Sequence, residues 1–208
     1  MVKDPATHLE PVLGGRGQDV RDAALTLFAE KGYVGTSMKD IGRRLGIRAP
    51  ALYNYVASKH DLLSDVIIRT LDQLLANQVA AVAGEEDVAE QLRAATEAHV
   101  RYSARYWREV IVTDRDFLSL QEPTRSRVLQ LRRRYERGFR SIIERGCDGG
   151  RFDVQEPKLA SYAIIEVGLS IAQWYRARGP LSIEEVARHH GIFALRIVGA
   201  DNLPGLPN

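Results

Sequence analysis

The side chains best suited to chemistry in this chain lie in one short stretch, where hydrogen-bond donors, aromatic rings and small residues occur together. The major groove of DNA admits a helix whose first residues reach the base edges, and arginine is the commonest side chain to contact guanine there. Lys59 follows a few residues later and suits the phosphate backbone. The predicted chemistry is therefore contact with a DNA groove by outward-facing residues that combine hydrogen-bond donors and aromatic surface with a small profile near the helix start: Arg48, Ala49, Ala51, Tyr53, Asn54 and Tyr55.

Two short helices joined by a tight turn must position these side chains, and this arrangement is a helix-turn-helix. Thr36 and Ser37 are N-cap residue types, which accept hydrogen bonds from free N–H groups of a first helical turn. Gly46 permits the left-handed backbone conformation that ends a helix. Between these two signals, apolar residues recur at the spacing of a buried helical stripe, at Met38, Ile41 and Leu45.

The second helix is predicted to begin at Pro50, because proline has a preset φ and no N–H to leave unsatisfied at a helix start. Leu52 and Val56, four residues apart, then face inward. Ser58 and Asp61 resemble a capping box, with aspartate in place of the usual glutamate or glutamine, and predict the start of the next helix.

At this point the sequence resembles the tetracycline-repressor (TetR) family of one-component transcriptional regulators over roughly residues 18–66. The resemblance rests on segments in the family's order and spacing: LFAEKGY (27–33), the Thr36-Ser37 opening, DIGRRLGI (40–47) and ALYNYVASKHDLL (51–63). It implies an all-α fold, with an N-terminal three-helix helix-turn-helix domain and a C-terminal helical bundle that binds a ligand and forms a homodimer. We expect about nine helices in all.

Carried over position by position, the resemblance implies a set of DNA-contacting residues. For Tyr53 and Tyr55 the alternative is packing under the next helix, and for Lys39 it is a solvated helix face. Asp40 and Arg44 are expected to form a surface salt bridge. The implied DNA contacts are Thr36, Ser37, Lys39, Arg48, Ala49, Pro50, Tyr53, Asn54, Tyr55 and Lys59.

The sequence pattern divides the chain into three parts. Residues 1–17, with several glycines and prolines, are predicted to be a disordered arm, residues 18–63 the DNA-binding domain, and residues 64–208 the ligand-binding and dimerisation domain. A long apolar stripe in the helix at 59–83 indicates that this helix belongs to both domains. Other helices are predicted at 18–32, 88–107, 108–120, from 123 onward, at 157–176 and at 182–198.

The interior of the C-terminal bundle combines apolar residues with a few polar groups, which is the usual make-up of a ligand pocket. The alternative for each candidate is ordinary packing in the core. A row of arginines on the helix after residue 123, at 132, 133, 134 and 137, is predicted to be a solvated face. The candidate ligand-binding residues are His99, Tyr102, Tyr106, Trp107, Phe117, Tyr135, Phe139, Glu166, Leu169 and Gln173.

Residues 174–182 resemble the C-terminal pattern of a TetR subgroup that includes sensors of acyl-coenzyme A thioesters from fatty-acid or sterol breakdown. Arg105, Arg108, Arg115 and Arg176 supply cations that suit the phosphates of such a ligand. The same pattern equally fits helix packing at a dimer interface. A rival within the regulator class is a sensor of drugs or antibiotics that controls an efflux pump.

The predicted function is a ligand-responsive regulator, most simply a repressor, which binds a palindromic DNA operator as a dimer and is released by a small hydrophobic effector. An all-α enzyme is a remote alternative, because the five histidines show no spacing typical of a metal or catalytic motif. A helical adaptor that does not bind DNA would leave the helix signals around the polar, aromatic short helix unexplained. We therefore predict no enzyme activity, no catalytic residue, no metal site and no cofactor.

Charge and cysteine content agree with this interpretation. Residues 32–63 hold five basic and two acidic residues, whereas the whole chain has a net charge of +2, so the basic excess is local. The single cysteine, Cys147, cannot form an internal disulfide, which fits a reducing cytoplasm; a redox-sensing thiol is the alternative to a simple free thiol. With no secretory signal and no apolar run of 18 residues, we predict a cytoplasmic protein without a membrane partner.

Overall fold

The computed structural model describes residues 15–200, and this part of the chain is entirely helical, without strands, which confirms the all-α fold class. The predicted arm lies mostly outside the described residues, but residues 15–17 already belong to the first helix. The helices are α1 (Gly15–Lys31), α2 (Met38–Leu45), α3 (Ala49–Leu52), α4 (Lys59–Val82), α5 (Val88–Arg105), α6 (Trp107–Arg115), the 3₁₀ turn η1 (Phe117–Ser119), α7 (Thr124–Asp148), α8 (Pro157–Leu169), α9 (Ile171–Trp174) and α10 (Ile183–Ile197).

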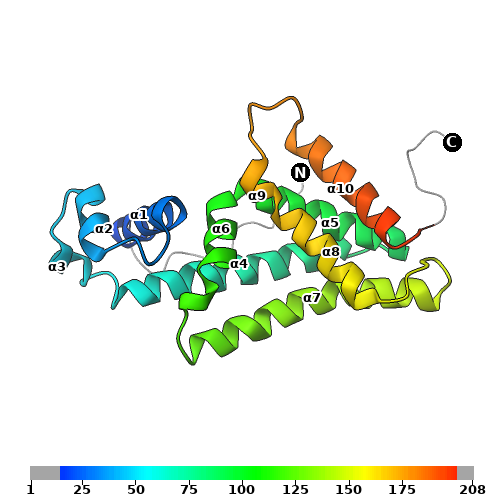
Figure 1. Cartoon of the computed structure of the whole chain (residues 1–208), viewed down its shortest axis with the longest axis horizontal. Helices are drawn as coiled ribbons and strands as arrows, with labels where there is room; N and C mark the ends of the chain where they lie inside the picture. The colour runs from blue at the N-terminus through cyan, green and yellow to red at the C-terminus, as the bar shows by residue number, and fades with distance from the viewer. Residues whose placement is uncertain (1–14, 201–208) are drawn as a thin grey trace.

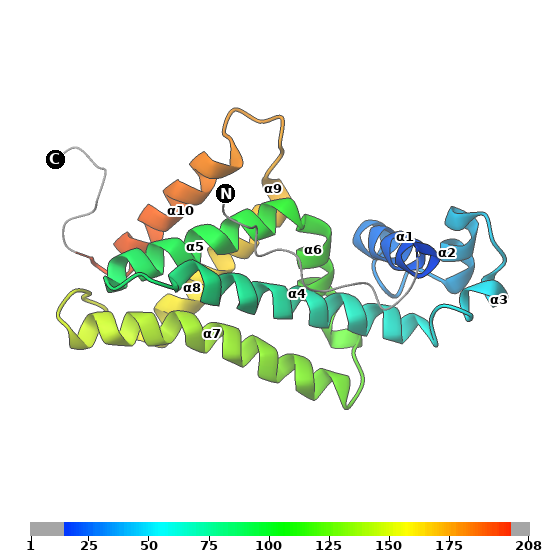
Figure 2. The ribbon, with the colours of Figure 1, turned by 180° about the vertical axis from the view of Figure 1, so that it is seen from behind.

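Helices α1 to α3 form one end of an elongated molecule, and α4 runs from this end into the larger group of helices (Figures 1 and 2). Helix α4 contacts α1 near its start and α5, α6 and α7 further along. The predicted apolar stripe of α4 is buried over its whole length, from Leu62 to Leu75. The same helix therefore packs against both groups of helices.

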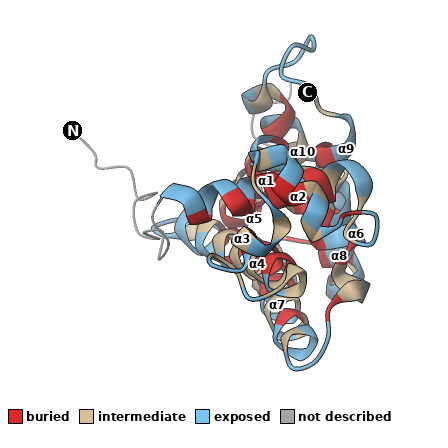
Figure 3. Ribbon diagram, turned by 90° about the vertical axis from the view of Figure 1, so that its left-hand side faces the viewer, coloured by how far each residue is buried: buried red, intermediate tan, exposed pale blue. Residues whose placement is uncertain are grey.

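One continuous hydrophobic core joins the two groups. It extends from Val20 and Phe28 of α1 through α4 and α7 to Leu195 of α10. Viewed from the α1–α3 end, buried positions follow the inward-facing sides of these helices and exposed positions the outside (Figure 3). A contiguous core of this kind transmits displacement between elements, because protein interiors are packed nearly as densely as crystals.

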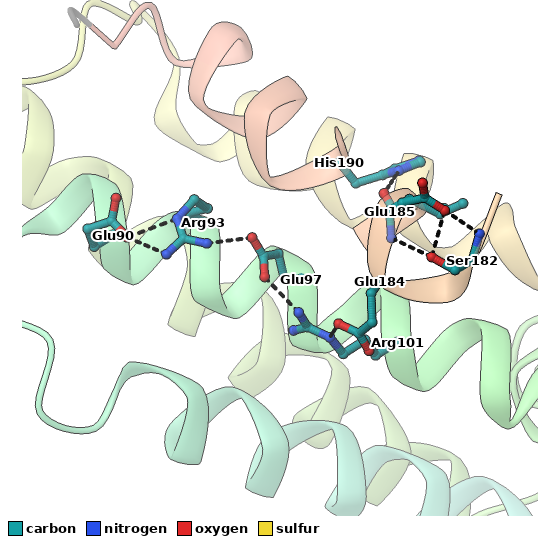
Figure 4. A network of polar contacts seen from close by, with 9 residues as sticks. Glu90, Arg93, Glu97, Arg101, Ser182, Glu184, Glu185 and His190 are labelled. Carbon is teal, nitrogen blue, oxygen red and sulfur yellow. Dashed lines mark hydrogen bonds and ion pairs between the residues drawn. The ribbon is translucent and has the colours of Figure 1, made fainter. Parts of the chain in front are cut away.

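Helix α10 packs along α5, and its start agrees with the sequence prediction. The Ser182 hydroxyl accepts a hydrogen bond from the Glu185 amide at 3.2 Å, and the Glu185 carboxylate accepts one from the Ser182 amide at 2.8 Å. On the neighbouring surface, Arg101 of α5 bonds both Glu97 and Glu184, at 2.8 Å each (Figure 4). The contact with Glu184 ties the first turn of α10 to α5, whereas the contact with Glu97 lies within α5.

The predicted helix at 157–176 is divided. Helix α8 ends at Leu169, and α9 ends at Trp174, well before Gly179 and Pro180, the residues that the sequence pattern indicates as the stop. Tyr175 is extended, and the Arg176 guanidinium donates to the carbonyl oxygens of residues 173 and 175. These bonds satisfy carbonyls at the helix end, so the chain leaves the helix earlier than the glycine and proline indicate. The helix expected at 108–120 likewise ends at Arg115, with η1 following.

Within residues 15–200, no helix is both long and apolar enough to cross a membrane. In the same range no three histidine, cysteine or acidic side chains gather in a way that would hold a metal ion.

Candidate nucleic-acid interface and effector cavity

The helix-turn-helix forms as the sequence predicts for its first helix and turn. Ser37 and Asp40 make a complete capping box at the start of α2. Gly46 is left-handed, with φ of 68°, and ends the helix. A Cβ on Gly42 would lie 2.7 Å from the Ile47 carbonyl oxygen, so the absence of a side chain lets the turn fold back onto α2.

The second helix is shorter than its sequence pattern indicates. Helix α3 covers only Ala49–Leu52, and the next residues continue in a tighter winding, with hydrogen bonds from the amides of residues 53, 54 and 55 to the carbonyls three residues earlier. The outward-facing residues after Leu52 thus lie on a turn rather than on a regular α-helix. Tyr53 is 55% exposed on this turn.

Most of the predicted DNA contacts are accessible at this end of the molecule. Tyr55 packs partly against the core, while Ala49 and Lys59 are half-buried. The exposed members of the set are Ser37, Lys39, Arg48, Pro50, Tyr53 and Asn54.

Thr36 does not face outward. It is 1% exposed, and its hydroxyl donates to the carbonyl oxygens of Gly32 at 2.8 Å and Leu27 at 3.2 Å. This side chain connects the start of the helix-turn-helix to the end of α1. Any DNA contact at this position would therefore have to come from atoms other than the hydroxyl.

Lys59, at the start of α4, is used inside the protein. Its ammonium donates to the carbonyl oxygens of Tyr33 at 2.8 Å and Thr36 at 2.7 Å, and lies 4.1 Å from the centre of the Tyr33 ring. Partial burial lowers the pKa of Lys59. These contacts hold the α1–α2 loop against α4, while a phosphate contact by Lys59 stays a prediction.

The surface ion pairs of α2 differ from the expected Asp40–Arg44 pair. Asp40 lies 3.5 Å from Arg43, and Arg44 lies 3.9 Å from Glu30 of α1. The capping interaction directs the Asp40 carboxylate back toward Ser37, at the start of α2, so Arg43 rather than Arg44 comes within reach. Exposed pairs of this kind contribute little stability.

A second point of contact between the two groups of helices lies at the end of α6. The Arg115 guanidinium donates to the carbonyl oxygens of Phe28 and Ala29, in the last turn of α1. Asp116 is 7% exposed, pairs with Arg115 at 2.9 Å and accepts a hydrogen bond from the Tyr33 amide at 3.3 Å. A cation at a helix C-terminus is favourable, because the last carbonyls carry partial negative charge.

A cavity of about 170 Å³ lies between α4, α6, α7 and α8. Three of the predicted ligand-binding residues line it: Tyr135, Glu166 and Leu169. Its other apolar lining includes Leu71 and Leu74 of α4. An apolar cavity with a few polar groups is the usual make-up of a small-molecule site.

Sequence reasoning missed Arg132 and Thr113, which also line this cavity. The Arg132 guanidinium donates to the Thr113 carbonyl at 2.6 Å and lies 4.5 Å from the Phe117 ring centre. Burial lowers the pKa of Arg132, so the prediction of a fully solvated arginine face was wrong at this position. Arg132 stands three residues before Tyr135 on α7, and this helical spacing was the available signal.

Beneath the cavity, a buried polar chain joins three helices. The Tyr135 hydroxyl lies 2.8 Å from His99 Nδ1, and His99 Nε2 lies 3.0 Å from the Ile165 carbonyl of α8. Because that carbonyl can only accept, Nε2 carries the proton and the tyrosine hydroxyl donates to Nδ1. Burial lowers the pKa of His99 to about 4, so the ring is neutral.

The remaining predicted ligand-binding residues do not line this cavity. Tyr102 and Tyr106 border a space of about 250 Å³ beside α1, and Trp107 and Gln173 border one of about 700 Å³ between α5, α6 and α9. Phe139 is fully buried beside His99. Phe117 packs against the core next to Arg132. The ten residues are therefore distributed over several places in the bundle.

Fold and site together define a helix-turn-helix protein with a separate cavity among its remaining helices, and comparison with known families agrees with this fold. The model described as "Bacterial regulatory proteins, tetR family" matches residues 20–66, and "Tetracyclin repressor-like, C-terminal domain" matches residues 85–198, more than half of the chain. The chain therefore belongs to the TetR family. This confirms the predicted class of transcriptional regulator and, with it, the prediction that the protein is not an enzyme.

Similar proteins include the HTH-type transcriptional repressor KstR2 of Rhodococcus jostii strain RHA1, 27% identical over 187 residues, which cover 85% of this chain and 87% of that protein. The TetR-family regulator PfmR of Thermus thermophilus superposes with a TM-score of 0.76 at 33% identity, over 85% and 97% of the two chains. AibR, solved in complex with isovaleryl coenzyme A and operator DNA, shares the fold with a TM-score of 0.78 at 21% identity, over 89% and 99%.

Proposed function

We propose that this protein is a repressor that binds a palindromic DNA operator as a homodimer and is released by a small hydrophobic effector bound in the 170 Å³ cavity. The observation that carries the proposal is the position of α6. Thr113 and Asp114 of this helix line the cavity, and the next two residues, Arg115 and Asp116, bond α1 and the loop after it.

Release follows from this geometry. A ligand shifts the protein toward whichever conformation it binds more tightly. An effector that favours a displaced α6 would also move the contacts of Arg115 and Asp116 with the DNA-binding helices. Since a dimer must place two reading surfaces in successive major grooves about 34 Å apart, a small rotation of each group weakens operator binding.

Dimerisation is supported by exposed apolar side chains on the last long helices. Exposed apolar patches on a protein surface often mark interaction sites. These side chains are Leu159, Tyr162 and Val167 on α8 and Phe193 and Ile197 on α10, each 37% exposed or more. We assign the homodimer that the family resemblance implies to these two helices.

The effector class is proposed to be an acyl-coenzyme A thioester. One neighbour supports this class, because AibR was solved in complex with isovaleryl coenzyme A and operator DNA. The second candidate is a drug or antibiotic whose exporter the protein controls. The one observation that favours a drug or antibiotic is the apolar lining of the cavity.

The test is a gel-shift titration of protein on its operator, repeated with added acyl-coenzyme A thioesters and with a panel of apolar drugs. Release of DNA by a thioester, at concentrations that leave the dimer intact in sedimentation, supports the proposal. Release only by a drug selects the second candidate. Operator binding by a monomer would contradict the dimer model.

A further inference from the structure

The cavity between α4, α6, α7 and α8 is divided into an apolar floor and a polar mouth. Leu71, Leu74 and Val110 are each less than 5% exposed and form part of the floor. Asp114 and Glu166 are exposed and lie at the outer side. A matching ligand has an apolar part that contacts the floor of the cavity and a polar group that lies near the mouth.

Thr113 is one of the lining residues, and its hydroxyl has no hydrogen-bond partner. The residue is 6% exposed, and its Oγ1 atom is buried without a hydrogen-bond partner. Other buried helical threonines of the protein, Thr70 and Thr96, donate to the carbonyl four residues earlier, at 2.8 Å each. A buried polar group without a partner is costly. Here a ligand acceptor would supply the missing bond.

The charged residues of the lining select the kind of acceptor. Arg132 is the only cation among the lining residues, whereas Asp114, Glu136 and Glu166 are acidic, and Arg140 lies 3.7 Å from Glu136. Arg132 has no carboxylate within ion-pair distance among the described residues, so its guanidinium retains donors for a ligand. Burial and the nearby Asp114 carboxylate already raise the pKa of Glu166, and a ligand carboxylate would add a further negative charge beside them. A neutral carbonyl oxygen accepts the same hydrogen bonds without this penalty.

The volume of the cavity limits the size of the apolar part of the ligand. A dry cavity of about 150 Å³ accommodates benzene. At about 170 Å³, this cavity holds a group of similar size, and a longer chain would have to extend through the mouth.

We propose that the cavity binds a small neutral acyl group, whose carbonyl oxygen accepts hydrogen bonds from the Thr113 hydroxyl and the Arg132 guanidinium, and that it rejects the corresponding free acid. The inference rests on the proposed function, because it specifies the effector chemistry of the same cavity. The rest of an acyl thioester then lies outside the mouth.

Calorimetric titration of the purified protein with isovaleryl-N-acetylcysteamine, a thioester without phosphates, tests this directly against isovalerate. We expect at least about tenfold tighter binding of the thioester. Thr113→Val, which removes the hydroxyl but keeps the shape, should weaken thioester binding about tenfold, as expected for loss of one good hydrogen bond. Its melting temperature should not fall, because the hydroxyl has no partner in the free protein.

Ser103→Ala is the matched control, because Ser103 Oγ is also buried and unpaired but does not line the cavity. It should retain wild-type thioester affinity. Glu166→Gln should raise the affinity for isovalerate more than the affinity for the thioester, because it removes a negative charge beside the ligand. Equal binding of acid and thioester, wild-type affinity in Thr113→Val, or no thioester binding by folded protein would each overturn the inference.

These outcomes are separable from the proposed function. Operator DNA released by an unrelated apolar compound, with no thioester bound, overturns the acyl assignment and leaves the repressor proposal standing. Thioester binding that depends on Thr113, in a protein that binds no operator, supports the acyl assignment and contradicts the repressor.

Discussion

At the scale of single residues, two positions that the family resemblance assigns to DNA have their polar atoms engaged within the protein. The Thr36 hydroxyl and the Lys59 ammonium both bond backbone carbonyls around the loop between α1 and α2. They position the exposed residues around them. Tyr53, in contrast, is exposed on the turn after α3.

This difference predicts opposite results for two substitutions. Lys59→Met should lower the free energy of unfolding by about 1–2 kcal/mol, because two hydrogen bonds from a charged donor are lost at a partly exposed site. Tyr53→Ala should leave stability unchanged and weaken operator binding. Urea unfolding and gel shifts on both variants separate the effects, and full stability in Lys59→Met would show that its internal bonds contribute nothing.

His99 predicts a pH dependence of stability. Its pKa is about 4 in the folded protein and about 6.5 when exposed, so the unfolded chain binds more protons between these values. His99 therefore contributes about 3 kcal/mol to the free energy of unfolding above about pH 6.5, and this contribution is lost as the pH falls toward 4.

The measurement is urea unfolding of wild type and His99→Gln from about pH 4 to about pH 7.5, which spans the two pKa values. Carboxylates titrate in both proteins, so the difference between the two curves isolates the histidine. We expect the wild type to lose more stability than the variant as the pH falls through this range. Parallel curves would contradict a neutral, buried His99.

At the scale of elements, the α2–α3 turn depends on the left-handed conformation of Gly46. Gly46→Ala should destabilise the protein by about 1 kcal/mol, because a side chain disfavours positive φ. Gly15→Ala, at the start of α1 with open space around it, is the control and should be neutral or slightly stabilising. Thermal unfolding compares them, and equal melting temperatures would argue against this turn geometry.

Features set by neighbouring residues could be predicted from the sequence, whereas features that depend on contacts between distant helices could not. The helix-turn-helix was predictable because caps, turn glycine and apolar stripe act over a few neighbouring residues, as at Ser37, Gly46 and Ser58. The cavity was only partly predictable, since it forms where four helices meet. Tyr135 was found as an aromatic residue of the bundle, but Arg132 was assigned to solvent because no local pattern shows what faces it.

Helix α6 is the element that links cavity and DNA-binding helices, and Arg115 makes the link testable. Arg115→Ala should preserve effector affinity and the dimer, but reduce the factor by which effector weakens operator binding. The guanidinium bonds to α1 are lost, whereas the cavity lining is retained. Gel shifts with and without effector measure this factor, and an unchanged value would exclude the α6–α1 contact as a route.

At the scale of the whole molecule, effector and operator must influence each other equally. If effector weakens operator binding by a given factor, bound operator weakens effector binding by the same factor. The long α4, the continuous core and the α6–α1 contact give this coupling a physical route between the two ends of the molecule. Each protomer of the proposed dimer contributes one reading surface.

Operator recognition by the helix-turn-helix is tested most directly by selection of bound fragments from genomic DNA with the purified protein, followed by gel-shift titration of the best site at stated salt. We expect a palindrome with two half-sites, bound by a dimer, and weaker binding by Tyr53→Ala. Recovery of no preferred sequence, or binding that Tyr53→Ala leaves unchanged, would contradict the assignment of this surface to operator recognition.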